Sequence, residues 1–202
     1  MRRAKSQLAS LVLAGAVLGG CAAAFVPATS DPWKKYTYAC ALLGVNRLIP
    51  AERLLRESMS SLEKTDEHVR LAVVQLQYAQ LIESPAFLNN RTLAQRVADM
   101  GGISGVANTA HELNVNAKSS LLEALSSPAT QNSPVDRTQA LLVLIEAHAR
   151  LGEVREACGA VERAAESYRQ AEGINYQYLM YPAGTVREHL SERRQSLGCA
   201  AS

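Results

Sequence analysis

Segments with the helical spacing of apolar side chains recur along this chain in neighbouring pairs. The clearest is residues 67–83, in which Val69, Val73 and Leu76 belong to one broad apolar face. Apolar residues at intervals of three and four lie on one side of a helix, whereas a half-buried strand needs strict alternation. Aromatic residues make up only 5% of the chain, and alanine and leucine, which favour helices, are abundant. The sequence therefore predicts an all-α fold.

Turn residues divide the chain into helices that are short enough to form helical hairpins. We expect a first αα-hairpin over residues 32–63, opened by Asp31 as the N-cap and Pro32 in the first turn. Residues 101–119 contain several glycines and asparagines, so we expect less regular structure there, and we expect a loop over 126–135. The other expected helices cover residues 67–83, 88–100, 121–125, 136–151, 153–172 and 185–197.

The last helical pair has a regular spacing of small and apolar residues. Gly152 falls at its turn, Ala157 is a small residue in its second helix, and Val161 and Ala164 follow four and seven residues later. This pattern resembles a tetratricopeptide repeat, in which small residues let two helices pack closely. The first pair matches the same pattern with Ala51 in the place of Ala157. The resemblance implies hairpins stacked into a solenoid.

The distance between the two matches sets the expected number of repeats. Ala51 and Ala157 are 106 residues apart, close to three steps of roughly 34 residues. Two degenerate repeats would then lie over 67–100 and 101–126. We expect about three to four repeats plus a C-terminal helix, all within a domain of residues 32–202. A generic helical bundle with alanine-rich contacts is the alternative.

The N-terminus carries a different pattern. Arg2, Arg3 and Lys5 give a positive start, an apolar run follows over residues 8–18, and Leu18-Gly19-Gly20-Cys21 closes it. The run is shorter than the ~20 apolar residues that span a bilayer, and its layout is that of a secretory signal. The closing tetrapeptide resembles the bacterial lipobox. The alternative is an ordinary signal peptide with a chance cysteine.

The lipobox resemblance implies a lipoprotein. Residues 1–20 would be the signal peptide, Cys21 would carry a diacylglycerol, and residues 21–31 would be a tether between lipid and fold. In Gram-negative lipoproteins an aspartate after the cysteine tends to keep the protein in the inner membrane. Ala22 stands there instead, so we expect an outer-membrane location facing the periplasm. We expect no cofactor other than this covalent lipid.

Charge argues against a nucleic-acid partner. The chain has 21 basic and 19 acidic side chains, but three of the basic ones lie in the expected signal, which leaves 18 against 19. A domain without a basic excess has no electrostatic support for binding phosphates.

Cysteine usage allows at most one internal disulfide beyond the lipidated residue. Cys40, Cys158 and Cys199 remain, and an oxidising periplasm would permit one bond among them. We favour Cys158–Cys199 because both lie in the C-terminal half. The alternative, that all three are small packing residues, stays open.

No motif for catalysis or metal binding stands out. The chain lacks a phosphate-binding loop, and its four histidines have no partner at a recognised metal spacing. His148 and Cys158 form the only local pair, and Cys158 falls on the predicted packing side of its helix. We expect no catalytic residue, no metal ligand and no small-molecule substrate.

A partner-binding groove is what the repeat resemblance implies. In tetratricopeptide arrays one face of the first helix of each hairpin lines a concave groove that binds peptides or proteins. Trp33 is the sole tryptophan, and tryptophan and tyrosine are enriched at binding hot spots; its alternative role is to close one end of the core. The groove candidates are Trp33, Tyr36, Leu43, Gln139, Leu142 and Glu146, with Cys40 and Ala149 on the same faces.

These features favour a non-enzymatic lipoprotein that holds an envelope protein partner. Two other classes remain. One is a peptidoglycan-binding or envelope-binding structural protein that uses Tyr176, Tyr178 and Tyr181 as a sugar platform. The other is a cell-wall enzyme with an unrecognised site.

Overall fold

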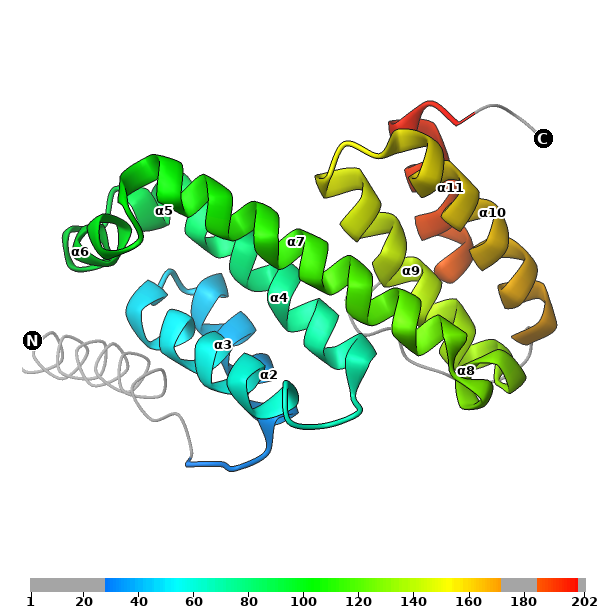
Figure 1. Cartoon of the computed structure of the whole chain (residues 1–202), viewed down its shortest axis with the longest axis horizontal. Coiled ribbons are helices and arrows are strands. Elements are labelled where there is room, and N and C mark those ends of the chain that lie inside the picture. The colour runs from blue at the N-terminus through cyan, green and yellow to red at the C-terminus, as the bar shows by residue number, and fades with distance from the viewer. Residues whose placement is uncertain (1–27, 172–184, 200–202) are drawn as a thin grey trace, which may run out of the picture.

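The computed structural model describes residues 28–171 and 185–199 and is all-α over them, with no strand (Figure 1). The expected signal peptide, Cys21, most of the tether, and Tyr176, Tyr178 and Tyr181 lie outside the described residues. The helices are α2 (Pro32–Gly44), α3 (Leu48–Leu62), α4 (His68–Glu83), α5 (Pro85–Leu88), α6 (Arg91–Asp99), α7 (Gly102–Ser126), α8 (Pro128–Asn132), α9 (Pro134–Arg150), α10 (Val154–Ala171) and α11 (Val186–Leu197).

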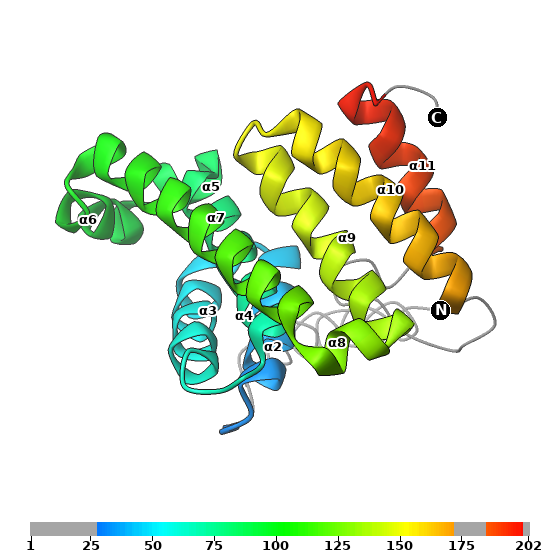
Figure 2. The ribbon, with the colours of Figure 1, turned by 45° about the vertical axis from the view of Figure 1, so that its right-hand side comes forward.

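The helices form stacked hairpins. α2 packs against α3, α4 against α7 and α9 against α10, and each hairpin rests on the one before it through α3·α4 and α7·α9 contacts. α11 packs against α10 as a single helix at the end of the stack. Figure 2 shows α7, α9, α10 and α11 side by side in chain order. The predicted all-α fold of stacked αα-hairpins is confirmed.

Two helices form the centre of the core. Every residue of α4 from Leu71 to Leu76 is buried, and so is every residue of α9 from Ala140 to His148. A helix that is buried on all sides needs neighbours on all sides, whereas a surface helix buries one stripe. α4 lies between the first and third hairpins, and α9 lies between the second hairpin and α10. These two helices therefore provide the packing contacts between neighbouring hairpins.

The prediction of irregular structure over residues 101–119 was wrong. α7 runs without a break for 25 residues and is the longest described helix. Its glycines and asparagines each cost up to about 1 kcal/mol relative to alanine, and burial of Val106, Leu113 and Leu121 against the core overrides that cost. Asn114 is buried as well, and its side-chain oxygen accepts a hydrogen bond of 3.0 Å from Arg150 Nε on α9. Tertiary contacts thus set this helix.

The placement of two degenerate repeats over 67–100 and 101–126 was also wrong. α4 pairs with α7, and the short helices α5 and α6 are an insertion between the two arms of that hairpin. The described residues form three hairpins, so the 106-residue distance between Ala51 and Ala157 spans two steps lengthened by the insertion. The expected loop over 126–135 contains the short helix α8.

Helix boundaries follow the capping residues closely. Asp31 Oδ1 accepts hydrogen bonds from the backbone N–H groups of Trp33 (2.9 Å) and Lys34 (3.2 Å), as expected for the N-cap of α2. Thr185 and Glu188 form a reciprocal capping box at the start of α11. Gly101 and Gly102, at the junction of α6 and α7, both have positive φ angles (85° and 76°) that suit glycine.

The insertion is tied to the first hairpin by a buried carboxylate. Glu52 on α3 is only 1% exposed. Its carboxylate accepts a hydrogen bond of 3.1 Å from Tyr78 Oη on α4 and forms an ion pair with Arg96 on α6. Arg56 Nε lies 3.5 Å from the same carboxylate. A buried charge is tolerated only when it is paired in this way. Burial raises the pKa of the Tyr78 hydroxyl, which keeps it a hydrogen-bond donor.

A disulfide joins the last helix to the stack. Cys158 in the second turn of α10 is bonded to Cys199, two residues beyond α11, with 5.5 Å between their Cα atoms. This is the pair that the sequence favoured. Val186 and Leu190 are the buried apolar residues of α11, and Arg194 Nη2 lies 2.6 Å from Glu162 Oε1 on α10. Covalent, apolar and ionic contacts together hold α11.

Candidate functional site

A cleft of about 800 Å³ opens between the second and third hairpins, where α4 and α9 begin and α7 ends. Its walls come from the first turn of α4, the last turn of α7, the short helix α8 and the first turns of α9. The lining residues are Asp66, Glu67, His68, Val69, Arg70, Glu123, Ala124, Ser126, Ser127, Pro128, Ala129, Thr130, Asp136 and Gln139.

Local sequence explains why the chain bends away here and leaves space. Ser127 caps α8, its hydroxyl accepting a hydrogen bond of 3.3 Å from Thr130 N, and Pro128 occupies the first turn. Ser133 in turn caps α9 by accepting from Asp136 N at 3.2 Å. Two successive caps force a short offset helix between α7 and α9. This short helix contributes Pro128, Ala129 and Thr130 to the wall of the cleft.

The cleft is lined by apolar side chains and has an exposed acidic rim. Val69, Ala124, Pro128 and Ala129 supply the apolar lining. Four carboxylates also line the cleft. The Arg70 guanidinium lines it as well and is ion-paired with Glu67. His68 Nδ1 lies 3.8 Å from Glu123 Oε2, and the Glu123 side chain is 68% exposed, so its charge faces solvent in the cleft.

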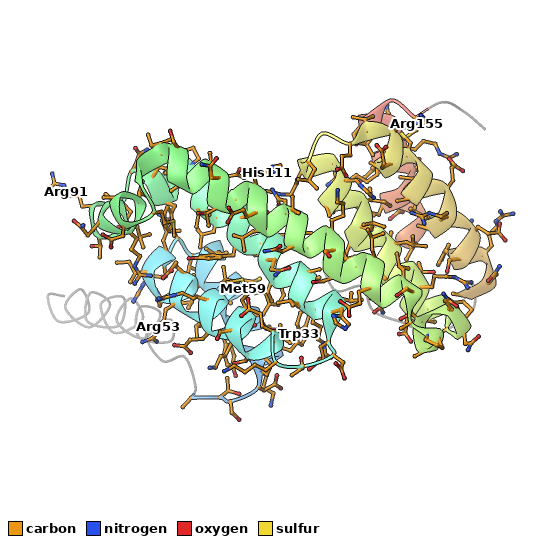
Figure 3. The ribbon with its side chains drawn as sticks, in the orientation of Figure 1. Trp33, Arg53, Met59, Arg91, His111 and Arg155 are labelled. Carbon is orange, nitrogen blue, oxygen red and sulfur yellow. A yellow bond between two sulfur atoms is a disulfide. The ribbon has the colours of Figure 1, made fainter. Side chains whose placement is uncertain are left out.

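Trp33 lies next to this cleft rather than inside it. Its ring stacks on that of Tyr36 with 4.6 Å between ring centroids, and the Arg70 guanidinium lies 5.2 Å from its centroid. Trp33 therefore lies beside the N-terminal end of α4 (Figure 3). Arg70 links the aromatic pair to the cleft, because the same side chain contacts Trp33 and lines the cleft wall.

The structure places the predicted groove residues in three different surroundings. Gln139 lines the cleft, and Trp33 is half-buried beside it. Tyr36 and Leu142 are only 7% and 4% exposed, so they have no surface to offer a partner and their groove assignment was wrong. Leu43 packs partly buried against the core, and Cys40 is half-buried, with burial raising the pKa of its thiol.

Glu146 is the clearest correction to the predicted groove. It is 8% exposed, and its carboxylate is 2.6 Å from Arg193 Nη2 and 3.8 Å from His189 Nε2, both on α11. Burial, and secondarily the charge of Arg193, lowers the pKa of His189 to about 4. Glu146 therefore faces α11. The repeat pattern did not predict this contact, because it treated the C-terminal helix as lying outside the repeats.

The pair of His148 and Cys158 is not assembled as a catalytic unit. Cys158 is disulfide-bonded, and His148 Nδ1 lies 2.6 Å from Glu153 Oε2. Lys118 Nζ contacts the other oxygen of Glu153, also at 2.6 Å. The hydrogen bond from Lys118, followed by that from His148, lowers the pKa of the Glu153 carboxyl. These contacts fasten α7 to the turn between α9 and α10.

Among residues 28–171 and 185–199 no group of three or more histidine, cysteine or acidic side chains is placed to hold a metal ion. Within the same ranges, no helix combines the length and apolar character needed to cross a bilayer. No protein-family model, curated protein or solved structure matches this chain.

Sequence reasoning missed most of the residues that line the cleft. Asp66 and Glu67 directly precede a strong helix, where acidic residues are common, so their position alone carried no functional signal. Nothing local indicates that Glu123 lies opposite them. That proximity arises because α7 runs antiparallel to α4, a pairing that depends on the unpredicted continuity of α7.

Proposed function

We propose that this protein is an outer-membrane lipoprotein that holds an envelope protein partner against the cleft between α4, α7, α8 and α9. The cleft is the observation that carries the proposal. It lies where the first helices of two neighbouring hairpins begin, beside the sole tryptophan, and its volume of about 800 Å³ suits a few inserted side chains. Stacked helices hold its walls in place, so little ordering is needed on binding.

Two independent features support an extracytoplasmic location. The first is the N-terminal signal that ends in Leu18-Gly19-Gly20-Cys21. The second is the bond between Cys158 and Cys199, because disulfides persist in oxidising compartments such as the periplasm and are rare in the cytosol. The disulfide and the N-terminal signal have no residue in common.

The mechanism would be localisation combined with a preformed surface. Acyl chains on Cys21 would supply about 0.8 kcal/mol of membrane affinity for each buried CH₂, and more than one chain makes anchoring stable. Restricting the protein to a membrane surface raises its effective concentration toward any partner in the same envelope. The cleft would then select the partner through its apolar side chains and its carboxylates.

Crosslinking in intact envelopes tests this function. The wild type is compared with Cys21→Ala, which removes the anchor, and with Trp33→Ala, which removes the aromatic neighbour of the cleft. We expect one defined envelope protein to be captured by the wild type and lost with Trp33→Ala while the variant remains folded and anchored. Arg53→Ala, a change at an exposed position of α3, is the matched control and should leave capture unchanged.

Absence of specific capture by every variant would remove the scaffold proposal. Pelleting with purified cell wall would then be the next measurement, because wall binding is the competing function.

A further inference from the structure

We infer that the cleft between α4, α7, α8 and α9 binds an extended, basic segment of a protein, in which lysine or arginine alternates with apolar residues. This inference rests on the proposed partner-binding function and states the chemistry of the partner.

The alternation follows from the two kinds of lining. Half-buried Val69 and exposed Pro128 and Ala129 can receive one set of partner side chains, and carboxylates at the rim can receive the other. An extended segment points successive side chains in opposite directions, so alternate residues can meet the apolar side chains and the carboxylates. The cleft volume lies within the range of about 300–1,000 Å³ typical of pockets for small ligands, so it accommodates a short segment.

The balance of charge sets the sign of the partner. Asp66, Glu67, Glu123 and Asp136 line the cleft, and Arg70 already neutralises Glu67. Complementary charge steers association and penalises partners of the wrong sign, so phosphates and anionic lipid surfaces are disfavoured here.

The position of Glu123 is not explained by helix stability. Asp136 lies in the first turn of α9, where the helix dipole favours a negative charge. Glu123 lies in the last turn of α7, where the same dipole disfavours one. His68 Nδ1 at 3.8 Å is an ion-pair partner only when protonated. A basic residue of a partner would supply the missing positive charge.

Peptide binding to the full-length protein purified in detergent tests the inference. The probe is a short fluorescein-labelled peptide in which lysine alternates with valine, and fluorescence anisotropy reports binding. Versions with glutamine or glutamate in place of lysine are the peptide controls. We expect only the lysine peptide to bind, and its affinity to fall as salt is raised, because exposed charges are screened.

Variants at the rim then localise the binding. Glu123→Gln combined with Asp66→Asn should weaken binding by about tenfold, since exposed charge pairs contribute a few tenths to about 1 kcal/mol each. Glu112→Gln combined with Glu156→Gln removes two exposed carboxylates of α7 and α10 that do not line the cleft, and should leave the affinity unchanged. Replacement of Glu123 and Asp66 by lysine should make the glutamate peptide the better ligand.

Three results would overturn the inference. They are equal affinity for the lysine and glutamine peptides, equal loss with the rim and control variants, and no change of preference after charge reversal. If the lysine peptide does not bind but an envelope protein is still crosslinked in a Trp33-dependent manner, the basic partner is rejected and the proposed function is kept. Failure of both measurements would reject both. Circular dichroism verifies that each variant is folded, and the single change Glu123→Gln replaces any pair that is not.

Discussion

The bond between Cys158 and Cys199 should contribute about 4 kcal/mol to the free energy of unfolding. The two cysteines are separated by 41 residues, and closing a loop of that size removes unfolded-state entropy worth about 4 kcal/mol at 25 °C in the chain-entropy model. The perturbation is replacement of both cysteines by alanine, which avoids leaving an unpaired thiol.

The loss should appear first in α11. Without the bond, this helix keeps two buried apolar side chains, Val186 and Leu190, the partly buried Leu197, and its ion pairs with α9 and α10. Fully burying an apolar side chain contributes about 1.5–3 kcal/mol, whereas ordering each backbone residue costs about 1–2 kcal/mol. The remaining contacts therefore hold a helix of 12 residues weakly.

Urea unfolding followed by circular dichroism measures the global change, and hydrogen exchange measures the local one. We expect the double-alanine variant and the reduced wild type to unfold alike, both with amide protection lost earliest over α11. Cys40→Ala is the control, because Cys40 is a free cysteine. A double-alanine variant within about 1 kcal/mol of the oxidised wild type, with α11 amides as protected as before, would refute this reasoning.

Three further predictions concern other parts of the fold. Arg96→Ala removes a charge partner from the buried Glu52 and should cost about 3 kcal/mol in urea unfolding, and an unchanged midpoint would show that the pair is dispensable. The pKa of His189 is about 4 in the folded protein against an ordinary 6.5, so the unfolded chain binds a proton more readily. Stability should therefore fall by about 2 kcal/mol as the pH is lowered from 7 to 5. A His189→Gln variant whose stability has the same pH dependence would contradict this. Gly105→Ala should lower the melting temperature because its β-carbon would overlap a backbone carbonyl, whereas Gly159→Ala, which meets nothing, should be neutral or stabilising; equal shifts for the two would contradict this.

The parts of the fold that depend on neighbouring residues were predictable. The start of α2 at Asp31-Pro32, the glycine turn at 101–102 and the Thr185 start of α11 depend on capping and backbone preferences that are local in sequence. The apolar periodicity of 67–83 predicted α4 because that pattern is carried within the segment itself.

The parts that depend on distant contacts were not predictable from one sequence. α7 is continuous because the core covers one side of it, and its asparagines and glycines gave the opposite indication. The insertion of α5 and α6 changed which helices pair, so a fixed repeat length placed two repeats over 67–126, where the structure has one hairpin. Assignment of Glu146 and Leu142 to a groove failed for a related reason, since both are buried within the stack.

The most direct test of the account places a photoreactive residue at Ala129, an exposed position on α8 that lines the cleft, in the full-length protein in intact envelopes. The control places the same residue at Arg155, which is exposed on α10 at the far end of the stack (Figure 3). We predict that position 129 crosslinks one defined envelope protein and position 155 does not, and that Cys21→Ala weakens the crosslink. Equal crosslinking at the two positions, or none at position 129, would contradict a partner held in this cleft.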